Sequence, residues 1–209
     1  MTARVKLCGQ TSAADVRAAA EAGADAVGVI AGVPVDTHRE VSLETAAALF
    51  AATPPFVTRV LVTMPETADE AIDRIERTDP DMIQLHGSYE ADELAAVAAH
   101  APVIAALDVT DDDGLAAADP VVDAVLLDST DDHGAGGTGE THDWALARTR
   151  VETVSVPVIL AGGLTPANVG DAITEVDPYG VDVASGIETG EDKDPAAMAS
   201  FVAAARGGA

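Results

Sequence analysis

The chain has 209 residues and a mass of 21.1 kDa, enough for one compact domain that buries roughly 70% of its unfolded surface. Hydrophobic residues make up 48% of it, which excludes a disordered chain, and no uncharged apolar run approaches the ~18 residues that span a bilayer. The 11 basic and 36 acidic residues give a formal charge of −25, which excludes nucleic acid and anionic membranes as partners.

Short apolar runs rich in β-formers alternate along the chain with alanine-rich segments of helical spacing. The expected strands are residues 4–9, 26–30, 57–63, 82–86, 103–108, 124–128, 156–161 and 181–185. The expected helices include residues 12–22, 43–51, 66–77, 90–100, 166–175 and 195–205. The eight strand-helix units average about 26 residues, the length of a parallel βα unit.

This alternation favours a single closed (β/α)₈ barrel over residues 1–209. A doubly wound open sheet gives the same alternation and stays as the alternative fold. Two long segments, residues 31–41 and 129–141, follow the second and sixth expected strands. In a barrel such loops border the active site, so we expect both to act as lids.

Polar residues gather at the ends of the expected strands, where a barrel brings them to one mouth. Gly162 and Gly163 follow the seventh strand, and Ser185 and Gly186 follow the eighth. Backbone N–H groups beside helix N-termini bind phosphate, whereas glycines alone can simply close tight turns. The two pairs together predict a phosphate site.

Cys8 ends the first strand, and Lys6 lies two residues earlier on the same face of that strand. A lone cysteine is often only a small buried side chain, but a neighbouring ammonium would favour its thiolate. Hydrolysis by a thiolate nucleophile would need a histidine, and His86 lies on the fourth strand, across the barrel. We therefore favour Cys8 as a general base, and we expect Lys6 to point inward and contact Asp182 on the neighbouring eighth strand.

Asp128 ends the apolar sixth strand, where desolvation raises the pKa of a carboxyl toward the range of a general acid. Its alternative role is a helix cap or a structural ion pair. Arg39, on the loop after the second strand, either clamps a substrate carboxylate or merely solubilises the surface. The five histidines have no metal-binding spacing, so we expect His86 to be a polar wall residue rather than a ligand.

The chain resembles the phosphoribosylanthranilate isomerases of tryptophan biosynthesis over nearly its full length. The motifs are KLCGQT (residues 6–11), GADAVG (23–28), Arg39, QLHG (84–87), LDS (127–129), GGTG (136–139), DW (143–144), LAGGL (160–164) and VDVASGIE (181–188). The resemblance implies a cofactor-free (β/α)₈ barrel that performs an Amadori rearrangement on a small phosphorylated substrate.

The resemblance also implies roles for individual residues. Cys8 matches the general base and Asp128 the general acid, while Arg39 matches the residue that holds the substrate carboxylate. We expect further substrate contacts from His86, Gly137 and Asp182, phosphate binding from the two glycine-containing pairs, and no metal.

Two other classes of protein stay open. One is a related phosphate-binding barrel enzyme. An indole-glycerol-phosphate synthase would require catalytic lysines at strand ends, and a ribulose-phosphate epimerase would require metal-binding pairs of His and Asp. The other is a sugar-phosphate binding protein without activity, which would not need Cys8.

Composition also predicts the cellular setting. The acidic residues are spread along the whole chain, which indicates a surface adapted to strong salt. One cysteine cannot form an intramolecular disulfide, and the first residues lack the apolar core of a secretory signal. We expect a halophilic cytoplasmic protein, either a monomer or a homodimer.

Overall fold

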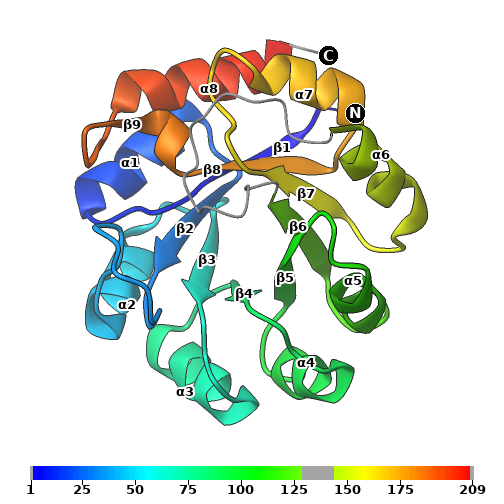
Figure 1. The fold of residues 1–209 in the computed structure, drawn as a ribbon. Coiled ribbons are helices and arrows are strands. Elements are labelled where there is room, and N and C mark those ends of the chain that lie inside the picture. The colour runs from blue at the N-terminus through cyan, green and yellow to red at the C-terminus, as the bar shows by residue number, and fades with distance from the viewer. Residues whose placement is uncertain (1, 129–143, 208–209) are drawn as a thin grey trace.

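Eight parallel strands form a closed ring at the centre of the computed structural model, which describes residues 2–128 and 144–207 (Figure 1). Each strand pairs with the next along the chain, and β8 pairs with β1 to close the barrel. The strands are β1 Arg4–Leu7, β2 Ala26–Ile30, β3 Thr58–Thr63, β4 Met82–His86, β5 Val103–Asp108, β6 Ala124–Asp128, β7 Val158–Ala161 and β8 Gly180–Val183. The expected closed barrel is therefore confirmed, and the open sheet is excluded.

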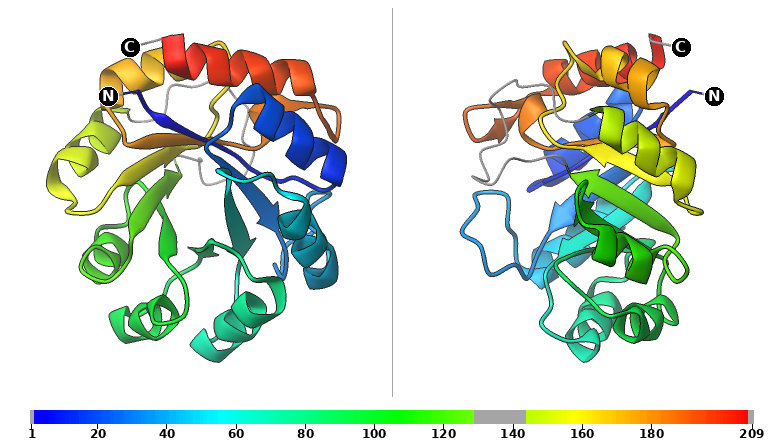
Figure 2. Two further views of the ribbon diagram at one scale, coloured as in Figure 1. Left: turned by 180° about the vertical axis from the view of Figure 1, so that it is seen from behind. Right: turned by 45° about the vertical axis from the view of Figure 1, so that its right-hand side comes forward.

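An outer ring of helices surrounds the strands, as views from both ends of the barrel show (Figures 1 and 2). The helices are α1 Ala13–Ala22, α2 Leu43–Ala52, α3 Ala68–Thr78, α4 Ala91–Ala98, α5 Asp112–Ala118, α6 Trp144–Thr153, α7 Val169–Val176 and α8 Pro195–Gly207. Ser12, Ser42 and Thr67 accept backbone hydrogen bonds as N-caps and thereby fix the starts of α1, α2 and α3. None of the described helices combines the length and the apolar character needed to cross a membrane.

The strands separate two apolar clusters because successive side chains point to opposite faces. The outer cluster fills the space between strands and helices with aliphatic side chains and with Phe50, Trp144 and Phe201. The inner cluster lies inside the barrel and contains small and aliphatic side chains together with Cys8. The low aromatic content of the chain suits this narrow interior.

Several expected boundaries were wrong. β1 stops at Leu7 and β8 at Val183, because the residues after them turn into the barrel mouth, and Ser185–Ile187 form a 3₁₀ turn, η1. The helix expected from residue 166 begins at Val169. A two-stranded hairpin, β9 Glu188–Thr189 and β10 Asp192–Lys193, was not foreseen.

Candidate active site

The carboxyl ends of the strands bring the predicted polar residues to one mouth of the barrel. Cys8 follows β1, His86 ends β4 and Asp128 ends β6, while the glycine-containing loops follow β7 and β8. Asp128 is half-buried and pairs in register with Ala161 of β7. Residues 129–143, which include Gly137 and the whole of the second expected lid, lie outside the described residues.

Cys8 is buried against the inner face of the barrel, at 4% exposure. Its backbone N–H donates to the carbonyl of Val183 at 2.8 Å, which anchors it to β8. Gly28, on β2, leaves room for the thiol, because a Cβ there would lie 2.7 Å from Sγ of Cys8. Gly9 then turns the chain away with a φ of +75°, a conformation that favours glycine.

Lys6 points into the barrel below Cys8, and its Nζ donates to Oδ1 of Asp182 at 2.9 Å. This contact confirms the expected pairing of β1 with β8. Burial raises the pKa of the Cys8 thiol above its ordinary value, and the positive charges of Lys6 and Lys193 oppose that rise without cancelling it. The charge of Lys6 favours the thiolate, as expected, but the effect of burial on the pKa of Cys8 is larger.

Arg39 reaches the mouth from the loop between β2 and α2, and its guanidinium holds a carboxylate of the protein itself. Nε donates to Oε1 of Glu188 at 2.7 Å and Nη2 donates to Oε2 at 2.6 Å, which is a bidentate pair. Burial alone would raise the pKa of Glu188, but hydrogen bonds from Arg39 and Lys193 outweigh burial and lower it. An arginine fork is therefore present at the mouth, and here it holds the carboxylate of Glu188, while the expected contact of Arg39 with a substrate carboxylate stays a prediction.

His86 lies at the barrel wall, where its Nε2 is 2.7 Å from Nε2 of Gln84. Burial lowers the pKa of His86 to about 4, and the charge of Lys6 adds to this effect. The imidazole is therefore neutral at pH 7 and offers a polar contact without charge. Within residues 2–128 and 144–207, no three His, Cys, Asp or Glu side chains form a group that could hold a metal ion.

The loops after β7 and β8 form a compact glycine-lined surface. Gly162 and Gly163 both adopt positive φ, at +87° and +59°. The side chain of Asn168 fastens this loop by donating to the carbonyl of Gly163 at 3.0 Å. A Cβ at Gly186 would collide with the carbonyl oxygen of Leu164, so the two loops approach each other more closely than any other residue type allows.

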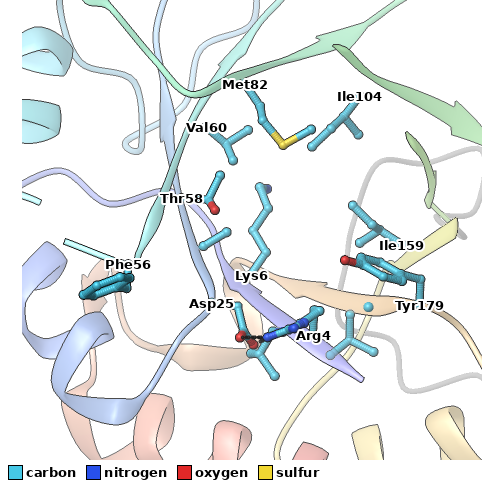
Figure 3. A pocket seen from close by; sticks show the side chains of 14 residues that line it. Arg4, Lys6, Asp25, Phe56, Thr58, Val60, Met82, Ile104, Ile159 and Tyr179 are labelled. Atoms are coloured by element: carbon cyan, nitrogen blue, oxygen red, sulfur yellow. Dashed lines mark hydrogen bonds and ion pairs between the residues drawn. The ribbon is translucent and has the colours of Figure 1, made fainter. Parts of the chain in front are cut away.

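A separate cavity of about 290 Å³ opens at the opposite, amino-terminal end of the barrel (Figure 3). The stem of Lys6 passes through it, surrounded by inward side chains that include Val60, Met82, Ile104 and Ile159. None of the predicted catalytic or phosphate-binding residues lines it. The residues predicted for catalysis and phosphate binding therefore lie away from this cavity, although it is well formed.

Two charged residues of the mouth were missed in the sequence. Glu188 and Lys193 face each other across the β9–β10 hairpin, and Nζ of Lys193 donates to Oε1 of Glu188 at 2.6 Å. Composition offered one signal, since Lys193 is one of only two lysines in the chain and follows the last barrel strand. A two-residue strand has too little pattern to reveal that it folds back over the mouth.

The fold and the placement of these side chains define a (β/α)₈ barrel enzyme with its site at the carboxyl ends of the strands. A sequence model of N-(5′-phosphoribosyl)anthranilate (PRA) isomerase matches residues 5–204. The chain belongs to this family.

Individual relatives agree. The N-(5′-phosphoribosyl)anthranilate isomerase of Halobacterium salinarum is 58% identical over 208 residues, covering 97% of this chain and 95% of the relative. The crystal structure of phosphoribosyl anthranilate isomerase from Thermotoga maritima superimposes with a TM-score of 0.87 at 33% identity, covering 98% of this chain and 99% of that one. An isomerase in complex with reduced 1-(o-carboxyphenylamino)-1-deoxyribulose 5-phosphate gives a TM-score of 0.83 at 32% identity, with the same coverage.

Proposed function

We propose that the chain converts N-(5-phosphoribosyl)anthranilate to 1-(2-carboxyphenylamino)-1-deoxy-D-ribulose 5-phosphate, the Amadori rearrangement of tryptophan biosynthesis. Family membership and the related structure with a carboxyphenylamino-deoxyribulose phosphate support this reaction. The observation that carries the residue assignment is the position of Cys8 and Asp128. The thiol follows β1 and the carboxyl group ends β6, so both lie at the same mouth of the barrel. Cys8 belongs to the inner cluster, and so do Ala124 and Leu126, the alternate residues of β6 that precede Asp128.

The reaction needs one proton donor and one proton acceptor, and these two residues supply them. Asp128, in its acid form, gives its proton to the ring oxygen of the ribose, while the anilino nitrogen pushes its electron pair toward C1. The C1–O bond breaks and a protonated Schiff base forms. The thiolate of Cys8 then removes the proton from C2, and the resulting enolamine gains a proton at C1 and loses one from the C2 hydroxyl to become the ketone.

Binding falls to the charged and glycine-lined parts of the mouth. Arg39 carries the planar fork that suits the anthranilate carboxylate, and the loops with Gly162, Gly163, Ser185 and Gly186 present backbone N–H groups to the phosphate. The neutral imidazole of His86 is a wall contact for the sugar. Asp182 is committed to Lys6 and therefore supports the site from below Cys8.

The setting completes the proposal. We assign the chain one barrel domain over residues 1–209, acting as a monomer or homodimer in a salt-rich cytoplasm. The match of the family over residues 5–204 supports the single domain. The formal charge of −25 and the Halobacterium salinarum relative support the salt-rich cytoplasm.

Turnover is measured as the decrease in fluorescence of freshly made phosphoribosylanthranilate when the enzyme is added. Cys8→Ala and Asp128→Ala should each lower kcat by at least ~100-fold with little change in KM, because acid and base groups act in the transition state. Asp108→Ala is the matched control. Asp108 ends the neighbouring strand β5 and pairs in register with Asp128, but its carboxylate accepts a hydrogen bond from the backbone N–H of Thr110 in its own loop. Wild-type turnover in either Cys8→Ala or Asp128→Ala would remove that residue from the mechanism.

A further inference from the structure

Three charged side chains form a buried cluster above Cys8, here called the Glu188 cluster: Arg39, Glu188 and Lys193. Glu188 is at its centre, with a side chain 5% exposed, and it accepts hydrogen bonds from both cations. The Lys193 side chain is 3% exposed, and its Nζ also donates to the carbonyl of Ala184 at 2.9 Å. Burying an ammonium is costly unless it is paired and hydrogen-bonded, and Glu188 and the carbonyl of Ala184 supply both kinds of partner here.

The cluster lies directly against the residue that follows the thiol. A Cβ on Gly9 would be 2.8 Å from Cδ of Arg39 and 3.2 Å from Nζ of Lys193. The carbonyl that Lys193 binds, that of Ala184, comes one residue after Val183, whose carbonyl accepts the N–H of Cys8. The ammonium is therefore tied to the same short stretch of β8 and η1 that anchors Cys8.

The charges around Cys8 can be counted from every side. Below it, Lys6 and Asp182 form a neutral pair. Above it, the Glu188 cluster holds two cations and one anion, which leaves one positive charge in excess. His38 lies beside this cluster, with its Nε2 3.6 Å from Oε2 of Glu188. His86, on the far wall, is neutral at pH 7, and Asp128 ends β6.

That excess charge opposes the cost of burying a thiolate. The side chains that share the inner cluster with Cys8 are apolar, and burial raises the pKa of the thiol. Lys193 lowers the pKa of Cys8, whereas its own pKa is lowered by burial and sustained by Glu188. Glu188 thus favours the charged form of Lys193, whose Nζ it contacts at 2.6 Å.

We propose that Lys193 is a positioning residue for the general base: its ammonium, held by Glu188 and by the carbonyl of Ala184, stabilises the thiolate of Cys8. The inference rests on the proposed function, because it assigns a support to the base of that reaction. Lys193 acts through Cys8 and not on the substrate.

The thiolate can be observed without turnover, because Cys8 is the only cysteine of the chain. Ultraviolet absorbance of the thiolate is followed against pH, with Cys8→Ser subtracted for the tyrosine background. Lys193→Met should raise the midpoint by about one unit, since loss of a nearby opposite charge disfavours the ionised form. Lys193→Arg, which keeps the positive charge, should return the midpoint most of the way to its wild-type value.

The control is Arg77→Met, which removes one positive charge from an exposed site on α3 that pairs with Glu44 and Asp73. It should leave the midpoint unchanged. An unchanged midpoint in Lys193→Met, or an equal shift in Arg77→Met, would overturn the proposal. If Lys193→Met does not fold, as judged by circular dichroism, Lys193→Gln takes its place, and a midpoint equal to that of the wild type overturns the proposal.

The pH dependence of kcat/KM gives the second readout. The value of kcat/KM should increase with pH as Cys8 ionises. In Lys193→Met this increase should occur at a higher pH, displaced by the same amount as the thiolate midpoint, with KM little changed. A midpoint that moves while Cys8→Ala keeps its turnover would sustain the electrostatic role of Lys193 and refute Cys8 as the base. The two failures are thus distinguishable.

Discussion

The buried pair of Lys6 and Asp182 should be one of the most sensitive points of the fold to mutation. Burial would lower the pKa of Lys6, but the charges of Asp182 and Cys8 outweigh burial and raise it, so Lys6 keeps its positive charge at neutral pH. Lys6→Met keeps the length of the stem and removes the charge. The carboxylate of Asp182, whose side chain is only 10% exposed, then stays in the barrel without its cation.

Removing one partner of a buried ion pair costs about 3–5 kcal/mol, because the other charge is left uncompensated. For a chain of this size each kcal/mol shifts Tm by roughly 2–4 °C, so Lys6→Met should lower Tm by roughly 6–20 °C. The double variant Lys6→Met with Asp182→Asn should regain much of that loss, since no buried charge remains. Thermal unfolding by circular dichroism, at one fixed KCl concentration, measures all three proteins.

The pH dependence separates charge from packing. In Lys6→Met the buried carboxylate of Asp182 has lost its cation, and binding a proton removes the uncompensated charge. The folded variant therefore gains more from protonation than its unfolded chain does, so the deficit against the wild type is complete near neutral pH and shrinks as the pH falls toward about 4. A loss below about 1 kcal/mol, or a loss independent of pH, would refute an uncompensated charge as the cause.

Two further substitutions test the binding groups. Arg39→Lys should raise KM for phosphoribosylanthranilate about tenfold, because an ammonium cannot present the planar fork, and should leave KM for phosphoribosylaniline unchanged. Equal responses of the two substrates would refute the carboxylate assignment. Gly186→Ala should weaken competitive inhibition by inorganic phosphate, because the new Cβ collides with the carbonyl of Leu164, whereas Gly170→Ala, whose Cβ meets only an ordinary contact at 3.7 Å, should not. Equal inhibition of both glycine variants and the wild type would move the phosphate site elsewhere.

Local sequence pattern predicted the alternating strand-helix units, because apolar runs and helical spacing are local properties, whereas closure of the barrel depends on the pairing of β8 with β1. Four of the eight strands, β2, β4, β5 and β6, begin and end where the apolar runs do. The alternation of side chains also placed Lys6 and Cys8 on one inward face, and the order of the strands then placed Lys6 beside Asp182. These inferences need only a period of two and the closure of the ring.

The contacts of Arg39 could not be predicted in the same way. Its partner Glu188 is 149 residues away, and the pair depends on how a loop after β2 meets a hairpin after β8. A strand of two residues has no detectable periodicity, so the hairpin that holds Lys193 could not be predicted from the sequence pattern. The end of β8 was also predicted wrongly, because Ser185, expected to be the last residue of that strand, belongs to the turn η1.

Salt should act on capture of the substrate and on stability in the same direction. Surface arginines such as Arg59, Arg77 and Arg148 are already paired with neighbouring acids, which leaves a large surplus of negative charge. A ligand with a phosphate and a carboxylate must approach this field of formal charge −25. Raising KCl from about 0.1 M to about 1 M shortens the screening length from about 10 Å to about 3 Å and also relieves repulsion among the surface acids.

The Glu188 cluster is buried, so its short contacts are screened much less than the diffuse surface field. We therefore expect kcat/KM to rise with KCl, chiefly through faster substrate capture, and Tm to rise in parallel. Stopped-flow binding and circular dichroism on the same samples separate the two effects. A kcat/KM that falls steadily while the protein stays folded would mean that attraction at the mouth outweighs surface repulsion, and that the surplus of acids is no adaptation to salt.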